Sequence, residues 1–192
     1  MEYNKILVPL DGSKLAEAVL PHVEKIALGC SLPNVLLVTV TQPIRVKTPK
    51  GERIEQLPAK HQSPILFYGS PSSSFGGEIV PATNMDVSVI IGKMAKSGYN
   101  YLSKIAQKLQ KDGIQVTVAV LIGDIAVEIP RFARQEEADL IVMASRGKTS
   151  LKRWDVANAA EKVFRATDVP IMLVKPPKGF KETKPTRKGK AL

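Results

Sequence analysis

Cysteine and histidine are scarce in this chain of 192 residues, which has one Cys and two His. A single cysteine cannot form an intramolecular disulfide, and it excludes a cysteine-based metal cluster. No apolar run approaches the roughly 20 residues that a membrane-spanning helix needs. The N-terminus also lacks the charged and then apolar pattern of a secretory signal. We therefore expect a cytoplasmic protein with no membrane partner.

Acidic residues are outnumbered by basic ones, and the net charge is +10. Residues 175–192 hold seven Lys or Arg and one Glu, so this short segment supplies more than half of the excess. Its prolines and few apolar residues predict a disordered basic tail over 177–192. The tail either solubilises the protein or contacts nucleic acid or another acidic surface. The hydrophobic fraction of 44% is typical of a globular core, and we expect one domain over 1–176.

Apolar, β-branched runs alternate with amphipathic segments along the chain. The runs predict five strands, at 5–10, 34–40, 114–123, 138–145 and 169–176, of which the first two have the pattern of strands covered on both faces. Helices are predicted from Ser13 to about Leu28, from a cap at Asp86 to near Lys111, after a cap at Asp124, and over 158–167. This order predicts an α/β fold, with a parallel sheet and helices on both faces.

The segment from Gln42 to about Met85 interrupts this alternation. It is rich in Pro, Gly and Ser, and loops of this length are uncommon inside a compact domain. We predict a flexible insertion at about 42–85, in which a short piece such as Ile65 to Tyr68 orders locally.

Polar residues that follow the strands are the candidate ligand contacts, because parallel sheets bind ligands at the carboxyl ends of their strands. Asp11 follows the first strand, and its carboxylate is suited either to a ribose or metal ion or to a local turn. Gly123 and Asp124 follow the third strand, where a turn and a helix cap account for both residues.

A basic loop follows the fourth strand. Backbone N–H groups at such a junction hold anions, and the loop carries four cations, Arg146, Lys148, Lys152 and Arg153. These cations either neutralise phosphates or form a solvated face. The sequence has no Gly-x-Ser-x-Gly, Walker-type or Gly-x-Gly-x-x-Gly motif. We therefore assign no catalytic residue and expect a protein that is not an enzyme.

Five stretches, taken in order, resemble the universal stress protein family: "KILVPLDGS", "VLLVTV", "LIGDIAVEI", "ADLIVMASRGKTSLKR" and "AEKVFRATDVPIMLVKP". The resemblance implies an open, Rossmann-like sheet of five parallel strands in the order 3-2-1-4-5. It also implies a homodimer formed through the last strand, Pro170–Val174. One branch of the family binds ATP through a Gly-x2-Gly-x9-Gly-Ser/Thr motif after the fourth strand, and another branch lacks both the motif and ATP binding.

The ATP motif is altered in this chain. Its first glycine falls at Ala144, its second is retained as Gly147, and its final pair falls at Ala157–Asn158. Lys148, beside the retained glycine, is a candidate phosphate contact. Alanine is tolerated where φ is negative and costs roughly 1 kcal/mol where φ is positive. The family's other nucleotide contacts correspond to Pro9, Asp11, Val40, Gly123 and Met143.

The resemblance supports two functions. The first is a non-enzymatic stress-response regulator with a degraded or altered ATP-binding loop, which acts through its dimer and an unknown protein partner. The second is a nucleotide sensor or weak ATPase that binds ATP with Mg, or another adenine nucleotide. A third, more distant expectation is nucleic-acid binding through the basic tail, with an affinity that falls steeply with salt.

Overall fold

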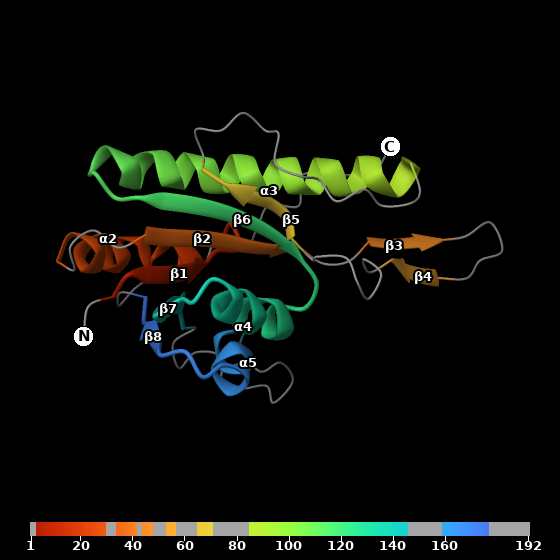
Figure 1. Cartoon of the computed structure of the whole chain (residues 1–192). Helices are drawn as coiled ribbons and strands as arrows, with labels where there is room; N and C mark the ends of the chain where they lie inside the picture. Colours follow the sequence, from red (N-terminus) through yellow and green to blue (C-terminus); the bar gives the residue numbers. More distant parts are fainter. Residues whose placement is uncertain are drawn as a thin grey trace.

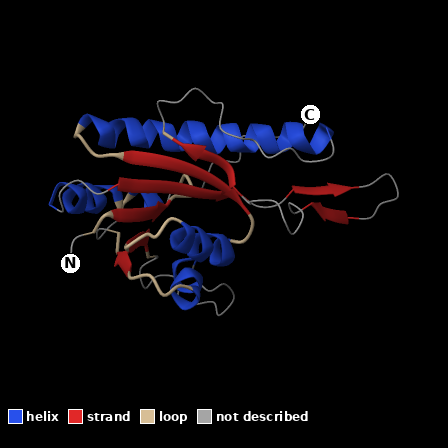
Figure 2. Ribbon diagram, in the orientation of Figure 1, coloured by secondary structure: helices blue, strands red, loops and turns tan. Residues whose placement is uncertain are grey.

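The computed structural model describes residues 3–29, 34–41, 44–47, 53–56, 65–70, 85–145 and 159–176. Its strands are β1 (Lys5–Pro9), β2 (Asn34–Thr41), β3 (Ile44–Lys47), β4 (Arg53–Gln56), β5 (Ile65–Gly69), β6 (Val116–Ile122), β7 (Leu140–Ala144) and β8 (Ile171–Val174). Its helices are α1 (Lys14–Glu17), α2 (Leu20–Gly29), α3 (Met85–Lys111), α4 (Ile125–Gln135) and α5 (Ala159–Ala166). Figure 2 shows these helices and strands together.

The main sheet has six strands in the order β5-β6-β2-β1-β7-β8. Five of them run parallel, and β5 pairs antiparallel with β6. The parallel strands β6, β2, β1, β7 and β8 are the third, second, first, fourth and fifth of the predicted strands. The predicted order 3-2-1-4-5 is therefore confirmed, with β5 as an added edge strand that the five-stranded prediction lacked. β3 and β4 form a separate antiparallel pair.

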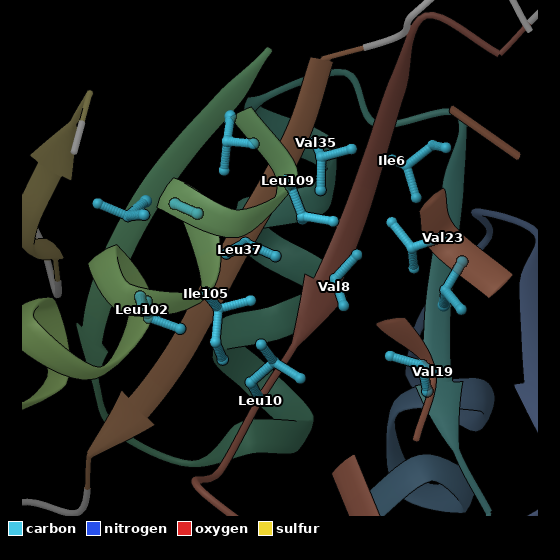
Figure 3. Packing of buried hydrophobic residues seen from close by; sticks show 14 of the residues in the cluster. Ile6, Val8, Leu10, Val19, Val23, Val35, Leu37, Leu102, Ile105 and Leu109 are labelled. Carbon is cyan, nitrogen blue, oxygen red and sulfur yellow. The ribbon is translucent and has the colours of Figure 1, made fainter. Parts of the chain in front are cut away.

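Helices cover both faces of the sheet, as predicted (Figure 1). Side chains alternate between the faces because successive residues of a strand point to opposite sides. Ile6 and Val8 join a larger cluster with residues of α2 and α3, shown in Figure 3 with Val23 and Leu102. Leu7 joins a smaller cluster with residues of α4 and α5. Burial on both faces explains the nearly continuous apolar runs of these strands.

The added strand β5 is held by side chains on both faces of the sheet. Phe67 is 1% exposed, and its ring packs edge-on against Tyr99 of α3 with 4.3 Å between centroids. Tyr68 lies on the other face, where its ring is 6.1 Å from that of Phe132 and its hydroxyl donates to Glu136 at 2.8 Å. Burial, together with the Glu136 carboxylate, raises the pKa of Tyr68 to about 12. The sheet therefore incorporates part of the insertion, at the place where local order was expected.

The predicted helix from Ser13 to about Leu28 is wrong as a single element, because the structure divides it into α1 and α2. The cause is Pro21. In a continuous helix its nitrogen would have to donate to the carbonyl of Glu17, and its ring would clash there. Ser13 does cap α1, since its Oγ accepts from the Ala16 N–H at 3.1 Å.

Two other helix boundaries test the predicted caps. The long helix begins at Met85, so Asp86 lies inside its first turn and not at the predicted cap, while the end at Lys111 is confirmed. Asp124 caps α4 as predicted, with its carboxylate accepting from the Ala126 N–H at 2.8 Å. The cap fixes where α4 leaves the carboxyl end of β6.

Candidate functional site

The candidate ligand contacts of β1, β2, β6 and β7 lie on the same side of the sheet, where the carboxyl ends of these strands meet. We call this side the strand-end edge. Pro9 pairs with Val38 of β2, and Thr41 pairs with Ile122 of β6. The pairing of Leu7 with Ile141 sets the register between β1 and β7. Since all four strands are parallel, their carboxyl ends meet at this edge, as the sequence analysis assumed. The proposed contact residues therefore share one location, although they are far apart in the sequence.

Apolar packing closes the sheet beneath this edge. Pro9 and Met143 are buried, and Met143 belongs to the smaller cluster, against which the half-buried Val40 also packs. Ala144 packs against the larger cluster, on the opposite face. Any ligand at this edge would therefore lie outside a layer of packed apolar side chains.

Ala144, the first altered position of the ATP motif, has ordinary strand geometry. It is the last residue of β7, where it pairs with Val174. Among the described residues Glu137 is the one non-glycine with a positive φ, so Ala144 carries no left-handed strain. Its methyl group consequently costs nothing in backbone conformation, which was the open question at this position.

Asp11 forms the local turn that was one of its two alternatives. Its Oδ1 accepts from the Ser13 N–H at 2.9 Å, and Gly12 between them has a φ of +81°. The side chain is exposed at the strand end. The turn sets the backbone and leaves the carboxylate facing solvent, so the turn role and a ligand role are compatible at this residue.

A tyrosine from α3 bonds to α1, the helix that follows this turn. Tyr101 donates its hydroxyl hydrogen to the Glu17 carboxylate of α1 at 3.1 Å. Burial of Tyr101 raises its pKa, the negative charges of Glu17 and Asp11 add to the rise, and a backbone hydrogen bond with Gly12 opposes it. Tyr101 thus links α3 to the end of α1. Sequence reasoning missed it because the partners lie 84 positions apart.

Gly123 is the most constrained backbone position at the edge. Its φ is +143°, and its N–H donates to the Thr41 carbonyl at 3.0 Å. The Thr41 hydroxyl in turn donates to the Leu121 carbonyl at 2.9 Å. A Cβ at position 123 would lie 2.8 Å from both Cγ and Oε1 of Glu128. Glycine is therefore required here by conformation and by space.

Glu128 is a buried carboxylate that the sequence analysis did not single out. Its side chain is 10% exposed, and Arg131 Nη2 lies 2.9 Å from its Oε2, an ion pair without aligned hydrogen-bond geometry. Burial raises the pKa of Glu128, with a smaller rise from Asp124 and an opposing effect of Arg131. The only sequence signal was its position one helical turn after the Asp124 cap. Glu128 places an acidic group against the Gly123 backbone.

Gly147, Lys148, Ala157 and Asn158 lie outside the described residues, as does the predicted tail 177–192. Within the described ranges, no group of three or more His, Cys, Asp or Glu side chains is suited to hold a metal ion. None of the described helices is long and apolar enough to cross a bilayer.

The fold and the strand-end geometry define an α/β protein of the open parallel-sheet class. The family model described as the universal stress protein family matches residues 2–175, so the chain belongs to this family. Universal stress protein MJ0577 from Methanocaldococcus jannaschii is 27% identical over 177 residues, which are 90% of this chain and 95% of that protein. The solved structure of MJ0577 superposes with a TM-score of 0.61 at 22% identity, over 93% of this chain and 99% of that chain.

Two similar solved structures contain adenine nucleotides. One is a universal stress protein in complex with cAMP, with a TM-score of 0.52, 14% identity, and coverage of 91% of this chain and 98% of that one. The other is a universal stress protein family protein from Arabidopsis thaliana with AMP bound, with a TM-score of 0.52, 15% identity, and coverage of 91% and 93%. At these identities the likeness concerns the fold.

Proposed function

We propose that this chain is a non-enzymatic regulatory protein that binds an adenine nucleotide at the strand-end edge, with an altered loop that holds the phosphates weakly. The observation that carries the proposal is the assembly of Pro9, Asp11, Val40 and Gly123 at one edge. The sequence that follows β7 lacks two of the three motif glycines. The two nucleotide-bound structures of the same fold support the choice of ligand.

The free-energy costs of the motif substitutions favour a nucleotide site with weakened phosphate contacts over a complete loss of nucleotide binding. The methyl of Ala144 adds no backbone strain. Each charge-assisted hydrogen bond lost at Ala157 and Asn158 would cost about 1.5–3 kcal/mol. Losing one such bond at each position, about 3–6 kcal/mol in all, moves a micromolar ligand to about 0.1 mM or weaker. The base and ribose should therefore supply most of the affinity.

Calorimetric titration of the full chain with adenosine, AMP and Mg-ATP tests this proposal. We expect dissociation constants of about 0.1–1 mM that differ by less than roughly tenfold among the three ligands, because the phosphates contribute little. Restoring the motif with Ala144→Gly, Ala157→Gly and Asn158→Ser should strengthen Mg-ATP binding at least tenfold and leave adenosine unchanged.

Asp11→Asn should weaken all three ligands, since it removes the charged acceptor proposed for the ribose. Asp112→Asn is the matched control, because Asp112 is another exposed turn aspartate but lies after α3, before β6 begins. Binding of Mg-ATP below about 100 μM by the unmodified chain would support the alternative, a nucleotide sensor or weak ATPase with a competent loop. Failure of all three ligands to bind at several millimolar would refute both.

The regulatory part of the proposal includes a homodimer formed through Pro170–Val174. β8 is the edge strand of the sheet, and Leu173 on it is 46% exposed, so a second copy can extend the sheet and cover this side chain. Sedimentation equilibrium should give twice the chain mass at about 50 μM, and Leu173→Lys should return the monomer mass. A monomer throughout the micromolar range would exclude this dimer. An unidentified protein partner, contacting the 42–85 insertion or the tail, completes the proposal.

A further inference from the structure

The solvent face of α3 carries a row of lysines with no acidic residue among them. Four lysines on it are exposed, Lys96, Lys104, Lys108 and Lys111. They lie within an arc of about 120° opposite the buried residues of the helix, and the row is about 22 Å long at 1.5 Å per residue. Along the chain the nearest acids are Asp86, in the first turn, and Asp112, just past the end.

These lysines are not neutralised by any described neighbour. None of the four forms an ion pair with a described residue. The opposite layer of the molecule differs, because its arginines are paired: Arg131 with Glu128, Arg134 with Asp168, and Arg165 with Glu161. Four lysines without an ion pair to a described residue therefore lie along α3, and Figure 1 shows α3 on the outside of the sheet.

Helix stability does not account for the row. The helix dipole favours cations only in the last turn, which explains Lys108 and Lys111 but not Lys96 or Lys104. Lys104 and Lys108 are four residues apart, where like charges destabilise a helix. An arrangement that works against the helix indicates that its charge serves an external ligand.

The other exposed side chains of this face fit one class of ligand. Ser97, Asn100 and Gln107 lie between the lysines and are exposed. Lysine, Ser, Asn and Gln are among the side chains that contact nucleic-acid phosphates. Protein interfaces are instead depleted in lysine and centre on aromatic or arginine anchors, and neither occurs among the exposed residues described between Lys96 and Lys111.

A membrane surface fits less well. Amphipathic helices bind lipid by inserting their apolar face. In the half of α3 whose side chains are described, Leu102, Ile105 and Leu109 are buried in the larger cluster and cannot insert. We propose that the lysine face of α3 is a sequence-independent binding surface for the phosphate backbone of nucleic acid. This surface is separate from the strand-end edge and from the basic tail.

Fluorescence anisotropy with a labelled 20-base-pair DNA duplex and a 20-nucleotide RNA tests the proposal on the full chain, at 50–200 mM salt. The test variant replaces Lys96, Lys104, Lys108 and Lys111 by glutamine, which keeps helix propensity. We expect at least a tenfold loss of affinity at 50 mM salt, and a salt slope that is shallower by about 3 to 4 because four phosphate contacts are removed. Replacing the same four residues by arginine should retain binding, which separates loss of charge from loss of fold.

The matched control removes the same charge from the tail, with Lys181, Lys184, Lys188 and Lys190 replaced by glutamine. We expect it to lose at most threefold. The proposal is overturned if the tail variant loses as much affinity as the α3 variant, or if the unmodified chain binds neither oligonucleotide at 50 mM salt. Binding through α3 to vesicles with 30% phosphatidylserine, without binding to either nucleic acid, also overturns it.

Discussion

Replacing Phe67 by alanine should lower the free energy of unfolding by about 3–5 kcal/mol, the usual cost of truncating a buried phenylalanine. Phe67 is 1% exposed and packs edge-on against Tyr99, so its removal leaves a cavity between β5 and α3. Urea denaturation followed by circular dichroism measures the change, and the melting temperature should fall by roughly 10 °C. A loss of this size would show that the insertion is part of the folding unit.

Phe164→Ala is the matched control for this experiment. It makes the same substitution at a phenylalanine of α5 that is 61% exposed, and we expect a change below about 1 kcal/mol. If Phe67→Ala costs no more than Phe164→Ala, then β5 is not docked on the sheet in solution. The main sheet would then end at β6.

Replacing Gly123 by alanine should destabilise the protein by about 2–4 kcal/mol. Two effects add. A φ of +143° is a conformation that only glycine adopts readily, and the new Cβ would lie 2.8 Å from the Glu128 side chain. Because Glu128 is buried beside its Arg131 partner, it has little room to withdraw. The substitution should also loosen the hydrogen bond from the residue-123 N–H to Thr41, which hydrogen exchange at that amide can report.

Gly113→Ala separates the two effects. Gly113 has a φ of +82°, and a Cβ there would meet nothing within 4 Å, so this variant reports backbone strain alone. We expect it to cost about 1 kcal/mol. Adding Glu128→Ala to Gly123→Ala should recover the steric part, giving a coupling energy of about 0.5–3 kcal/mol in the double-mutant cycle. Equal costs at positions 113 and 123, with no coupling, would contradict the close contact.

The positions of the parallel strands followed from their apolar runs, which are nearly continuous where a strand is buried on both faces. Their order followed from the resemblance to the universal stress protein family. Two of the three predicted caps, Ser13 and Asp124, were also correct, whereas the predicted cap at Asp86 was wrong. Asp124 bonds to an N–H two residues away, and Ser13 to one three residues away, so both interactions lie within a few letters of sequence. The break between α1 and α2 had its signal as well, since Pro21 stands inside the periodic apolar pattern that suggested one helix.

The candidate site was likewise predictable in part. Its edge of the sheet was predictable, because parallel strands place their carboxyl ends together. The roles of Tyr101 and Glu128 were not, since a tyrosine in a long helix and a glutamate after a cap look like surface residues until their partners are known. The free-energy cost of the methyl group at Ala144 was not predictable either. It depends on the backbone angle φ, which the pairing of Ala144 with Val174 fixes.

The sequence by itself determined the family, the five parallel strands, and the loss of two glycines from the loop after β7, since these depend on residue identity and local pattern. Tertiary structure decided that β5 joins the sheet through Phe67 and Tyr68, that Tyr101 bonds to Glu17 at the end of α1, and that Glu128 occupies the space beside Gly123. Each of these contacts depends on how the strands and helices pack together in the folded protein. Such packing leaves no periodic trace along the chain, because the free energy that selects it comes from burial shared among distant residues.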